Sequence, residues 1–225
     1  IINSDPSCTQ TVTISDANFK AKLLASNEDN EIAKNLDNLP FKIDANNDGI
    51  IQICEAEKVS SLNVDNSAII SMEGVLSFAN LKTLSCSNNE IVGLDVYSLK
   101  KLEYLFCFSN NLLNLNVQGL NNLLTIRCNY NQLTSLNLSS LNSLRSIYCD
   151  YNQISDLNIS NSNSIQDLRC SYNLITDISL SHLNNLVFLY INHNFLTTLD
   201  ISNLHNLDQF YCPFNQLTSI NASNS

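Results

Sequence analysis

Apolar and polar positions follow one another in a pattern that recurs every 21 residues along most of this chain. One column of the pattern is held by cysteine at every position except that of Ile191, and its cysteines are Cys86, Cys107, Cys128, Cys149, Cys170 and Cys212. A fixed period of this length indicates a solenoid, in which each repeat lays one strand beside the strand of the repeat before it. We therefore expect a function that is carried by a surface rather than by a deep pocket.

Each repeat contains a segment with the pattern LxxLxLxxNxL, from LKTLSCSNNEI at residues 81–91 to LDQFYCPFNQL at residues 207–217. We number its positions 1 to 11, so that cysteine stands at position 6 and asparagine at position 9. The asparagine column is unbroken and consists of Asn89, Asn110, Asn131, Asn152, Asn173, Asn194 and Asn215. An amide carries donors and an acceptor, so we expect stacked asparagines to satisfy the backbone where successive strands bend.

The second half of each repeat supplies three more apolar columns. They are Leu94, Leu115, Leu136, Leu157, Ile178, Leu199 and Ile220; then Val96, Val117, Leu138, Ile159, Leu180 and Ile201; then Leu99, Leu120, Leu141, Leu183 and Leu204, with Ser162 as the polar exception. These columns predict one continuous core. A repeat of 21 residues leaves too little chain for a full helix in each turn. We therefore expect a parallel β-sheet on the concave face and short 3₁₀ or extended pieces on the convex side.

The first part of the chain differs in character, and we predict an N-terminal cap at residues 1–58 followed by about eight repeat units at 59–225, the first of them degenerate. The degenerate unit contains Val59, Leu62, Val64 and Ile69. Ser15 and Asp16 precede an apolar helical pattern at residues 17–24, which predicts a helix with a polar N-cap. We expect this helix to seal the open first edge of the solenoid.

Within the cap, residues 44–55 read DANNDGIIQICE and match the EF-hand calcium loop. Gly49 permits the sharp turn of such a loop. The predicted calcium ligands are the side chains of Asp44, Asn46, Asp48, Gln52 (through water) and Glu55 (bidentate), and the carbonyl of Ile50. The alternative is an acidic loop that binds no metal. A single loop that follows Pro40 and has no second loop to pair with favours a structural rather than a sensory role.

The chain has eight cysteines, and six of them stand in the column described above. Neighbouring in-register strands lie about 4.8 Å apart with parallel side chains, whereas a disulfide needs Cβ atoms about 3.8 Å apart that point toward each other. We therefore interpret the column as free, buried thiols, and a row of thiolates along one line cannot surround a metal ion. Cys8 and Cys54 lie outside the column and are candidates for a disulfide that ties the N-terminal tail to the cap, given an oxidising compartment.

The positions between the inward columns predict an outward face. Positions 3, 5, 7 and 8 place rings and two arginines there, namely Tyr104, Phe106, Phe108, Arg127, Tyr130, Tyr148, Tyr151, Arg169, Tyr172, Phe188, Tyr190, His193, Tyr211 and Phe214. Tyr and Arg are favoured as interface anchors, so one hypothesis is a binding face for a protein or peptide, and a glycan is the second choice. The alternative is that cross-strand stacking of these rings only stabilises the sheet.

Composition excludes several classes of function. The net charge is −10 without a basic cluster, which argues against a nucleic acid or an anionic membrane as partner. No apolar run approaches the ~20 residues of a membrane span. The three histidines, His182, His193 and His205, fall at different repeat positions without an evident carboxylate or thiol partner. Because an enzyme needs convergent reactive groups, we expect no enzymatic activity.

The repeat segment is the leucine-rich-repeat pattern, and the repeat region resembles secreted bacterial leucine-rich-repeat surface proteins. Cysteine at position 6 is similar to that of the cysteine-ladder internalins, a subgroup of listerial adhesins. The opening VTISDANFKAKLLAS, followed by the calcium-type loop, resembles the cap of many secreted repeat proteins from gliding bacteria. The resemblance implies a leucine-rich-repeat solenoid of the α/β class with a small helical cap. It also implies a secreted or cell-surface location.

The function that this resemblance implies is attachment to a protein, peptide or glycan on a cell surface, without catalysis. The cap departs from that of the internalins, which is helical and lacks the calcium loop, so adhesion to a host cell rests on analogy. The chain begins at Ile1, and residues 221–225 end it in mid-repeat. We expect further repeats, a partner or an anchoring tail after them. A passive spacer that holds another domain away from a cell is the remaining alternative.

Overall fold

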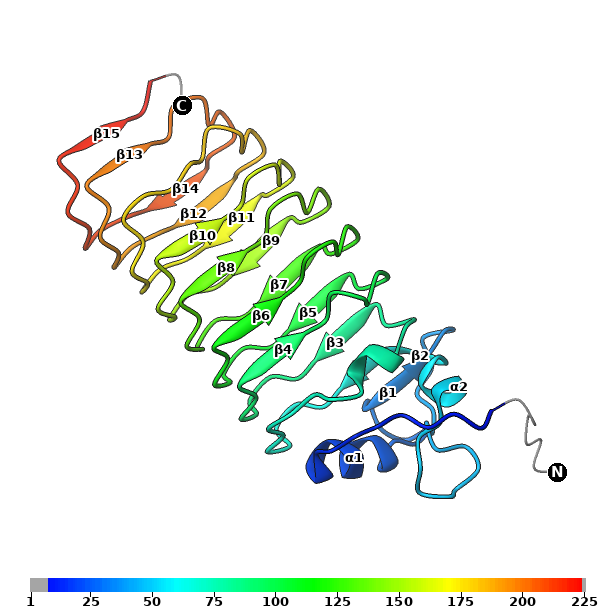
Figure 1. Ribbon diagram of the computed structural model, residues 1–225. Coiled ribbons are helices and arrows are strands. Elements are labelled where there is room, and N and C mark those ends of the chain that lie inside the picture. The colour runs from blue at the N-terminus through cyan, green and yellow to red at the C-terminus, as the bar shows by residue number, and fades with distance from the viewer. Residues whose placement is uncertain (1–7, 224–225) are drawn as a thin grey trace.

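The computed structural model describes residues 8–223 of the chain, and the Ile1 start and the last two residues of the 221–225 end lie outside them. The described residues form a long stack of turns with strands on two opposite sides, and the helices lie at the N-terminal end (Figure 1). The fold is a parallel β-solenoid of the leucine-rich-repeat type, as the period predicts. Most strands have three residues, because each turn of 21 residues contributes only a short extended segment to each sheet.

One side of the stack carries a nine-stranded sheet, which we call the main sheet and which corresponds to the predicted concave face. In spatial order its strands are β1 (Ala33–Asn35), β2 (Val59–Asn63), β3 (Thr83–Ser85), β5 (Tyr104–Phe106), β7 (Thr125–Arg127), β9 (Ser146–Tyr148), β11 (Asp167–Arg169), β12 (Phe188–Tyr190) and β14 (Gln209–Tyr211). From β2 onward neighbouring strands are parallel, and from β3 onward each residue faces the residue 21 positions along the chain. The 21-residue period of the sequence is therefore also the offset in residue number between paired residues on neighbouring strands.

The opposite side, which we call the return side, carries short extended pieces rather than helices, as expected. These strands are β4 (Gly93–Asp95), β6 (Asn114–Asn116), β8 (Ser135–Asn137), β10 (Asp156–Asn158), β13 (Thr198–Asp200) and β15 (Ser219–Asn221). They pair in parallel as β4 with β6, β8 with β10, and β13 with β15. Among the described residues one 3₁₀ turn, η1 (Val75–Ser77), occurs in the first turn of the stack.

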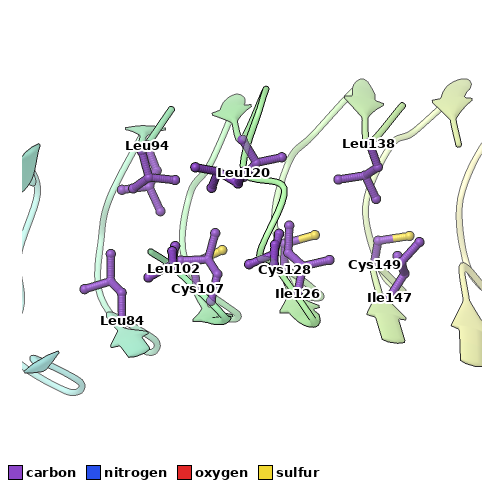
Figure 2. Close-up of a cluster of buried hydrophobic side chains, with 14 of the residues drawn as sticks. Leu84, Leu94, Leu102, Cys107, Leu120, Ile126, Cys128, Leu138, Ile147 and Cys149 are labelled. Atoms are coloured by element: carbon purple, nitrogen blue, oxygen red, sulfur yellow. The ribbon is translucent and has the colours of Figure 1, made fainter. Parts of the chain in front are cut away.

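The core lies between the two layers of strands (Figure 2). Cys86, Cys107, Cys128, Cys149 and Cys170 are free and completely buried beside the central leucine or isoleucine of each main-sheet strand. Cys212, in the last described turn, is free and half-buried because a neighbour covers it on one side only. Ile220 of the same turn is 44% exposed, whereas the earlier members of its column are buried or half-buried.

The asparagine column forms the hydrogen bonds that its position predicts. Asn131 donates from Nδ2 to the carbonyl oxygens of Cys107 and Cys128 at 3.0 Å each, and its Oδ1 accepts the backbone N–H of Leu112 at 3.0 Å. Asn110, Asn152, Asn173, Asn194 and Asn215 repeat this arrangement. Each amide therefore joins two successive turns at the point where the chain leaves the main sheet.

The N-terminal end of the stack is closed by more than the predicted helix. Helix α1 (Ala17–Leu24) has Asp16 as its N-cap, and it buries Phe19 and Leu23 against the core. The edge of the main sheet, however, is covered by β1, which pairs antiparallel with β2. The expectation that the helix seals this edge is therefore incomplete, because β1 supplies the backbone hydrogen bonds to the edge strand β2 while α1 covers apolar core residues.

The extended segment before α1 lies along the loop at residues 44–55. Val12 donates its backbone N–H to the carbonyl of Ile51 at 2.8 Å, and Ile53 donates to the carbonyl of Gln10 at 2.8 Å. Cys8 and Cys54 form a disulfide with their Cα atoms 5.7 Å apart. Cys54 belongs to the short helix α2 (Ile53–Ala56), so the bridge fixes the N-terminal segment to the end of the candidate calcium loop.

Candidate binding face and calcium loop

Position 5 of the repeat gives the main sheet a row in which rings and guanidinium groups alternate. The guanidinium carbon of Arg127 lies 4.7 Å from the ring centre of Tyr148 and 5.7 Å from that of Phe106. That of Arg169 lies 5.1 Å from Tyr148 and 4.7 Å from Tyr190. Equivalent side chains meet because the parallel strands are in register. We call Phe106, Arg127, Tyr148, Arg169 and Tyr190 the Arg–aromatic row.

Position 8 gives a second row of rings, which we call the edge row: Tyr130, Tyr151, Tyr172, His193 and Phe214. Their ring centres are 4.0 to 4.5 Å apart, and neighbouring planes differ by 9° to 28°. The sequence predicts these residues as outward-facing strand residues of the concave sheet, and this prediction is wrong for their position in the chain, because the main-sheet strands end at position 5. They stand in the turn that follows each strand, where each has a positive φ of 54° to 57°.

A left-handed backbone is unfavourable for a bulky side chain by about 1–2 kcal/mol per residue. An aromatic pair contributes about 0.5–1.5 kcal/mol beyond the area that it buries. In the edge row every ring packs on its neighbours, so stacking offsets much of this backbone cost. Stacking in the edge row therefore stabilises the turns that follow the strands, so the structural alternative applies to these rings, although they stack between turns and not between strands.

The Arg–aromatic row borders a groove of about 550 Å³ on the middle of the main sheet, lined by Phe108, Arg127, Asn129, Tyr148, Asp150 and Arg169. Arg169 forms an ion pair with Asp167 at 3.0 Å, and the Tyr148 hydroxyl donates to Asp167 Oδ2 at 2.8 Å. Desolvation and this hydrogen bond to a carboxylate raise the pKa of Tyr148. The hydroxyl therefore stays protonated, and these three side chains form one fixed network.

Asp150 supplies the carboxyl group that lines this groove. Its Oδ1 accepts the backbone N–H of Ser171 at 2.9 Å, which joins two successive turns. Burial raises the pKa of Asp150, because the charged form loses hydration there. Asp150 thus serves the backbone of the next turn rather than either arginine, since neither forms an ion pair with it among the described residues.

The remaining predicted face residues are placed less closely together. Tyr104 and Phe106 of β5 have ring centres 6.5 Å apart. Phe188 is half-buried on β12, and the Tyr190 hydroxyl donates to Gln209 Oε1. Tyr211 on β14 is 52% exposed and has no ring contact among the described residues. The predicted face is therefore two ordered rows with separate rings toward its ends.

Two exposed apolar residues beside the edge row were missed by the sequence interpretation. Leu174 and Phe195 stand at position 10, are each 45% exposed, and line a groove of about 520 Å³ with Tyr172, His193 and Phe214. The signal was present in the sequence, because position 10 is polar in the other repeats, as at Gln132 and Gln153. An apolar residue at a solvent-facing position of the repeat marks this surface.

The loop at residues 44–55 is folded around its own acidic side chains. Asp44 accepts the backbone N–H groups of Asp48 and Gly49 at 3.2 Å each, with Gly49 at a φ of +76°. Glu55 accepts the N–H groups of Ala45 at 2.8 Å and Gln52 at 3.1 Å. The side chains of Asp44 and Glu55 are buried, so their charges lie inside the turn of the loop.

The other predicted ligands surround Asp48. The Asn46 Nδ2 and Gln52 Nε2 atoms donate to Asp48 Oδ2 at 2.9 Å and 2.8 Å, and Asp48 Oδ1 accepts the N–H of Ile50 at 2.8 Å. No group of three or more His, Cys, Asp or Glu side chains in residues 8–223 is arranged to hold a metal ion. In the same range the buried carboxylates of Asp44 and Glu55 have no cationic side chain as an ion-pair partner. The donor set fits a hard cation in that it leaves buried negative charge unbalanced.

The histidines lie apart in the fold. His182 Nε2 lies 3.0 Å from the Ile159 carbonyl oxygen, His193 stacks in the edge row, and His205 is exposed. Burial raises the pKa of Cys128 to about 12, and the other fully buried thiols shift in the same direction. A nucleophilic thiolate does not form at these positions near neutral pH. None of the helices in the described range has the length and apolar character needed to cross a bilayer.

Known structures with this fold are leucine-rich-repeat proteins. Internalin C2 from Listeria monocytogenes is 27% identical, with a TM-score of 0.65 over 75% of this chain and 77% of that chain. The APL1 leucine-rich repeat domain is 21% identical, with a TM-score of 0.58 over 72% of this chain and 42% of that chain. The likeness to these two establishes the fold.

A third structure, the functional domain of InlJ from Listeria monocytogenes, includes a cysteine ladder; it is 22% identical, with a TM-score of 0.47 over 96% of this chain. The present chain spans 61% of the length of that domain. No model of a protein family matches the chain, and no curated protein is significantly similar to it.

Proposed function

We propose that this chain is a non-enzymatic extracellular binding module that recognises a protein or peptide on the outward face of its main sheet. The observation that carries the proposal is the Arg–aromatic row beside the groove on the middle of that sheet. Tyrosine and arginine combine contact area with hydrogen-bonding capacity, and both are enriched among residues that dominate binding energy. Their neighbours hold these side chains, so little conformational entropy remains to be lost on binding.

A protein ligand is favoured over a glycan by the way the rings are used. Sugars stack on free ring faces, but the rings of the edge row stack on each other and those of Tyr148 and Tyr190 pack against guanidinium groups. What these rows present to a ligand is ring edges, hydroxyl groups and guanidinium N–H groups. Such a surface matches the mixed polar and apolar character of a protein interface.

The test of the proposal compares two surfaces of one molecule. The wild-type chain is applied to an array of extracellular proteins and peptides and to a glycan array, beside a variant with Tyr148→Ala and Tyr190→Ala. The control variant is Tyr97→Ala, because Tyr97 is 47% exposed and follows β4 on the return side. We expect the double variant to lose the protein signals and the control to keep them.

Folding of each variant is checked by circular dichroism, and a second variant with Tyr148→Phe and Tyr190→Phe keeps the stacking while it removes the hydroxyl groups. If all variants fold and bind alike, the face is not the binding surface. Signals on the glycan array alone would favour the second ligand class. Silence on both arrays would favour a passive spacer, whose rings serve only the sheet.

We further propose that the loop at residues 44–55 binds calcium and stabilises the cap. Asp44, Asn46, Asp48, Glu55, the Ile50 carbonyl and, through water, Gln52 would hold the ion, which would neutralise the buried carboxylates of Asp44 and Glu55. The amides of Asn46 and Gln52 donate to Asp48, so a cation would require their oxygen atoms to turn inward instead. The role is structural, because the single loop lies beside the disulfide and α2 rather than between two long helices.

Calorimetric titration with calcium tests this second proposal directly. We expect one site on the wild-type chain and none on a variant with Asp44→Asn and Glu55→Gln. The control is Asp37→Asn, since Asp37 is exposed in the same part of the chain but lies outside the loop. Absence of heat and of bound calcium on the wild-type chain would overturn the site.

The extracellular part of the proposal is supported by the Cys8–Cys54 bridge, because such disulfides form and persist in oxidising compartments. Mass spectrometry of the chain isolated from its native source, with thiol alkylation before reduction, tests this point. Alkylated Cys8 and Cys54 would contradict an oxidising location.

A further inference from the structure

The two arginines of the groove differ in their partners, although they stand at the same repeat position. Arg169 donates to Asp167 from Nε at 3.0 Å and from a terminal nitrogen at 3.2 Å, so its charge is balanced within the fold. Arg127 is exposed, and its side chain forms no hydrogen bond and no ion pair with any residue in 8–223. The difference arises at position 3, where β11 has Asp167 and β7 has Thr125.

The surroundings of Arg127 hold its guanidinium group without using its donors. Its central carbon lies over the rings of Phe106 and Tyr148, 5.7 Å and 4.7 Å from their centres, and these ring contacts use none of its N–H groups, which are left for a ligand. A planar guanidinium presents several N–H donors in a fixed geometry that matches a carboxylate with two parallel hydrogen bonds. Phe108 and Asn129 line the same groove and supply one apolar and one polar contact.

The charge balance of the molecule makes this cation unusual. The chain carries 21 acidic and 11 basic residues, so an unpaired cation at the middle of the main sheet is a local feature and not part of a basic surface. The Asp150 carboxyl group shares the groove but is engaged by the Ser171 N–H. An anionic group of a ligand is therefore attracted at one point, and the negative charge elsewhere opposes a ligand that is acidic throughout.

We propose that Arg127 binds the carboxylate of an Asp or Glu side chain within a protein ligand, with apolar ligand residues against Phe106, Phe108 and Tyr148. The inference rests on the proposed function and names the chemistry of the ligand at the same face. An internal acidic residue is chosen because the groove lies over β5, β7, β9 and β11 with further strands on both sides, so that a chain can run across it. A terminal carboxylate or an acidic sugar is a different outcome of the test.

The experiment uses a library of random peptides displayed on phage, selected on the whole wild-type chain. We expect the enriched peptides to share one Asp or Glu with apolar neighbours. In synthetic copies, changing that acid to its amide weakens binding roughly tenfold or more, because a charged hydrogen-bond partner is lost. Added salt weakens the wild-type complex and has less effect on the amide peptide.

Three variants locate the effect on the protein. Arg127→Gln should weaken the acidic peptide roughly tenfold or more and leave the amide peptide unchanged, since the two changes remove the same interaction. Arg127→Lys retains the charge but lacks the planar pair of donors. Its affinity for the acidic peptide should therefore lie between that of the wild-type chain and that of Arg127→Gln. The matched control is Arg145→Gln, because Arg145 is exposed immediately before β9, outside the groove lining, and its removal changes the net charge equally.

The outcomes separate this inference from the proposed function. Peptides that bind the face but tolerate both the amide and Arg127→Gln would overturn the carboxylate and leave a protein-binding face. Equal losses of affinity in Arg127→Gln and Arg145→Gln would show that the effect comes from net charge, and this result would also overturn the contact between Arg127 and a carboxylate. Enrichment of free C-terminal carboxylates, or binding of acidic glycans alone, would assign Arg127 to another ligand, and a library without binders would count against both proposals.

Discussion

Asn131 contacts three backbone groups of two successive turns, so it shows what one side chain contributes to this stack. Replacing it with alanine leaves the N–H of Leu112 without a partner in the interior, and it removes one of the two amide hydrogen bonds to each of the Cys107 and Cys128 carbonyls, which Asn110 and Asn152 also contact. A buried group without a partner costs about 1–3 kcal/mol and each lost hydrogen bond about 0.5–1.5 kcal/mol, so we expect Asn131→Ala to lower the free energy of unfolding by roughly 2 kcal/mol or more. Denaturant unfolding measures this change.

The control for Asn131 is Asn121→Ala, since Asn121 is exposed and makes no side-chain hydrogen bond among the described residues. Its free energy of unfolding should change by no more than about 0.5 kcal/mol. Equal losses for the two variants would show that the column is not a source of stability. Asn152, whose amide makes the same bonds, serves as a second position for the same measurement.

Asp16 joins helix α1 to the first turn of the stack. Its Oδ1 accepts the N–H of Phe19 at 2.8 Å, and its Oδ2 accepts the N–H groups of Ile70 at 2.8 Å and Ser71 at 3.0 Å. We expect Asp16→Ala to destabilise the chain by about 1–3 kcal/mol, because it removes a helix cap and two contacts to the repeats. Asp16→Asn keeps one acceptor oxygen, so its free energy of unfolding should fall by about half as much. Equal thermal melting temperatures for the wild-type chain and the two variants would contradict this role of Asp16.

At the residue scale, the sequence predicted what the period determines and missed what depends on local contacts. The asparagine bonds follow from a buried polar column, because an amide at that depth must find partners. Ser162 interrupts a leucine column, and its hydroxyl donates to the Leu138 carbonyl at 2.7 Å and accepts the Leu141 N–H at 2.9 Å. The sequence marked it as an exception, but the bonds that keep it buried depend on two neighbouring turns.

Rings at position 8 could be assigned to a row from their spacing but not to their backbone conformation. A positive φ is rare for tyrosine and phenylalanine, so nothing in their residue type predicts the left-handed turn that they occupy. The partners of the two arginines could not be predicted either, because Arg169 donates a hydrogen bond to Asp167, two residues earlier on the same strand. The members of the candidate face could therefore be identified from the sequence, whereas their pairing depends on the three-dimensional arrangement of the strands.

The buried cysteine column makes the stability of the fold depend on pH. Burial raises the pKa of Cys128 from its ordinary 9.0 to about 12, and Cys86, Cys107, Cys149 and Cys170 shift in the same direction. The unfolded chain thus loses thiol protons at a lower pH than the folded chain. The contribution of each thiol to stability is complete below about pH 9 and decreases as the pH rises toward about 12.

We expect the free energy of unfolding to fall by about 1.4 kcal/mol per pH unit and thiol above pH 9. Denaturant unfolding at several alkaline pH values measures the slope, and Cys128→Ala should reduce it by the share of one thiol while it lowers stability at neutral pH. An unchanged slope in Cys128→Ala would refute the assignment, since other groups would then cause the alkaline loss.

Among the elements, the sequence predicted those that repeat and missed those that occur once. The main-sheet strands follow from a period that sets the register, and α1 follows from its N-cap and apolar spacing. Strand β1 has only three residues, and its pairing with β2 depends on the unpaired edge that the stack leaves at its first turn. A local sequence of three residues cannot reveal a strand that exists because of a distant edge.

The whole molecule behaves as a one-dimensional stack, because each main-sheet strand pairs only with its immediate neighbours. Stability in such a fold is approximately a sum of turns and of contacts between adjacent turns, so a change at one end spreads a short distance. The cap acts on the first turns through β1, α1 and Asp16, and the candidate face lies several turns away over β5 to β11. The calcium loop and the binding face should therefore be energetically independent.

Hydrogen exchange with and without calcium tests this independence in one measurement. If the loop binds calcium, a chelator removes the ion that balances Asp44 and Glu55, and the amides of α1, β1 and residues 44–55 should exchange faster. The strands β7, β9 and β11 should keep their protection, because they contact only neighbouring turns and bury their central residues completely. Faster exchange along the whole stack would show that the fold is one cooperative unit, and the variant with Asp44→Asn and Glu55→Gln should reproduce the chelated pattern without responding to calcium.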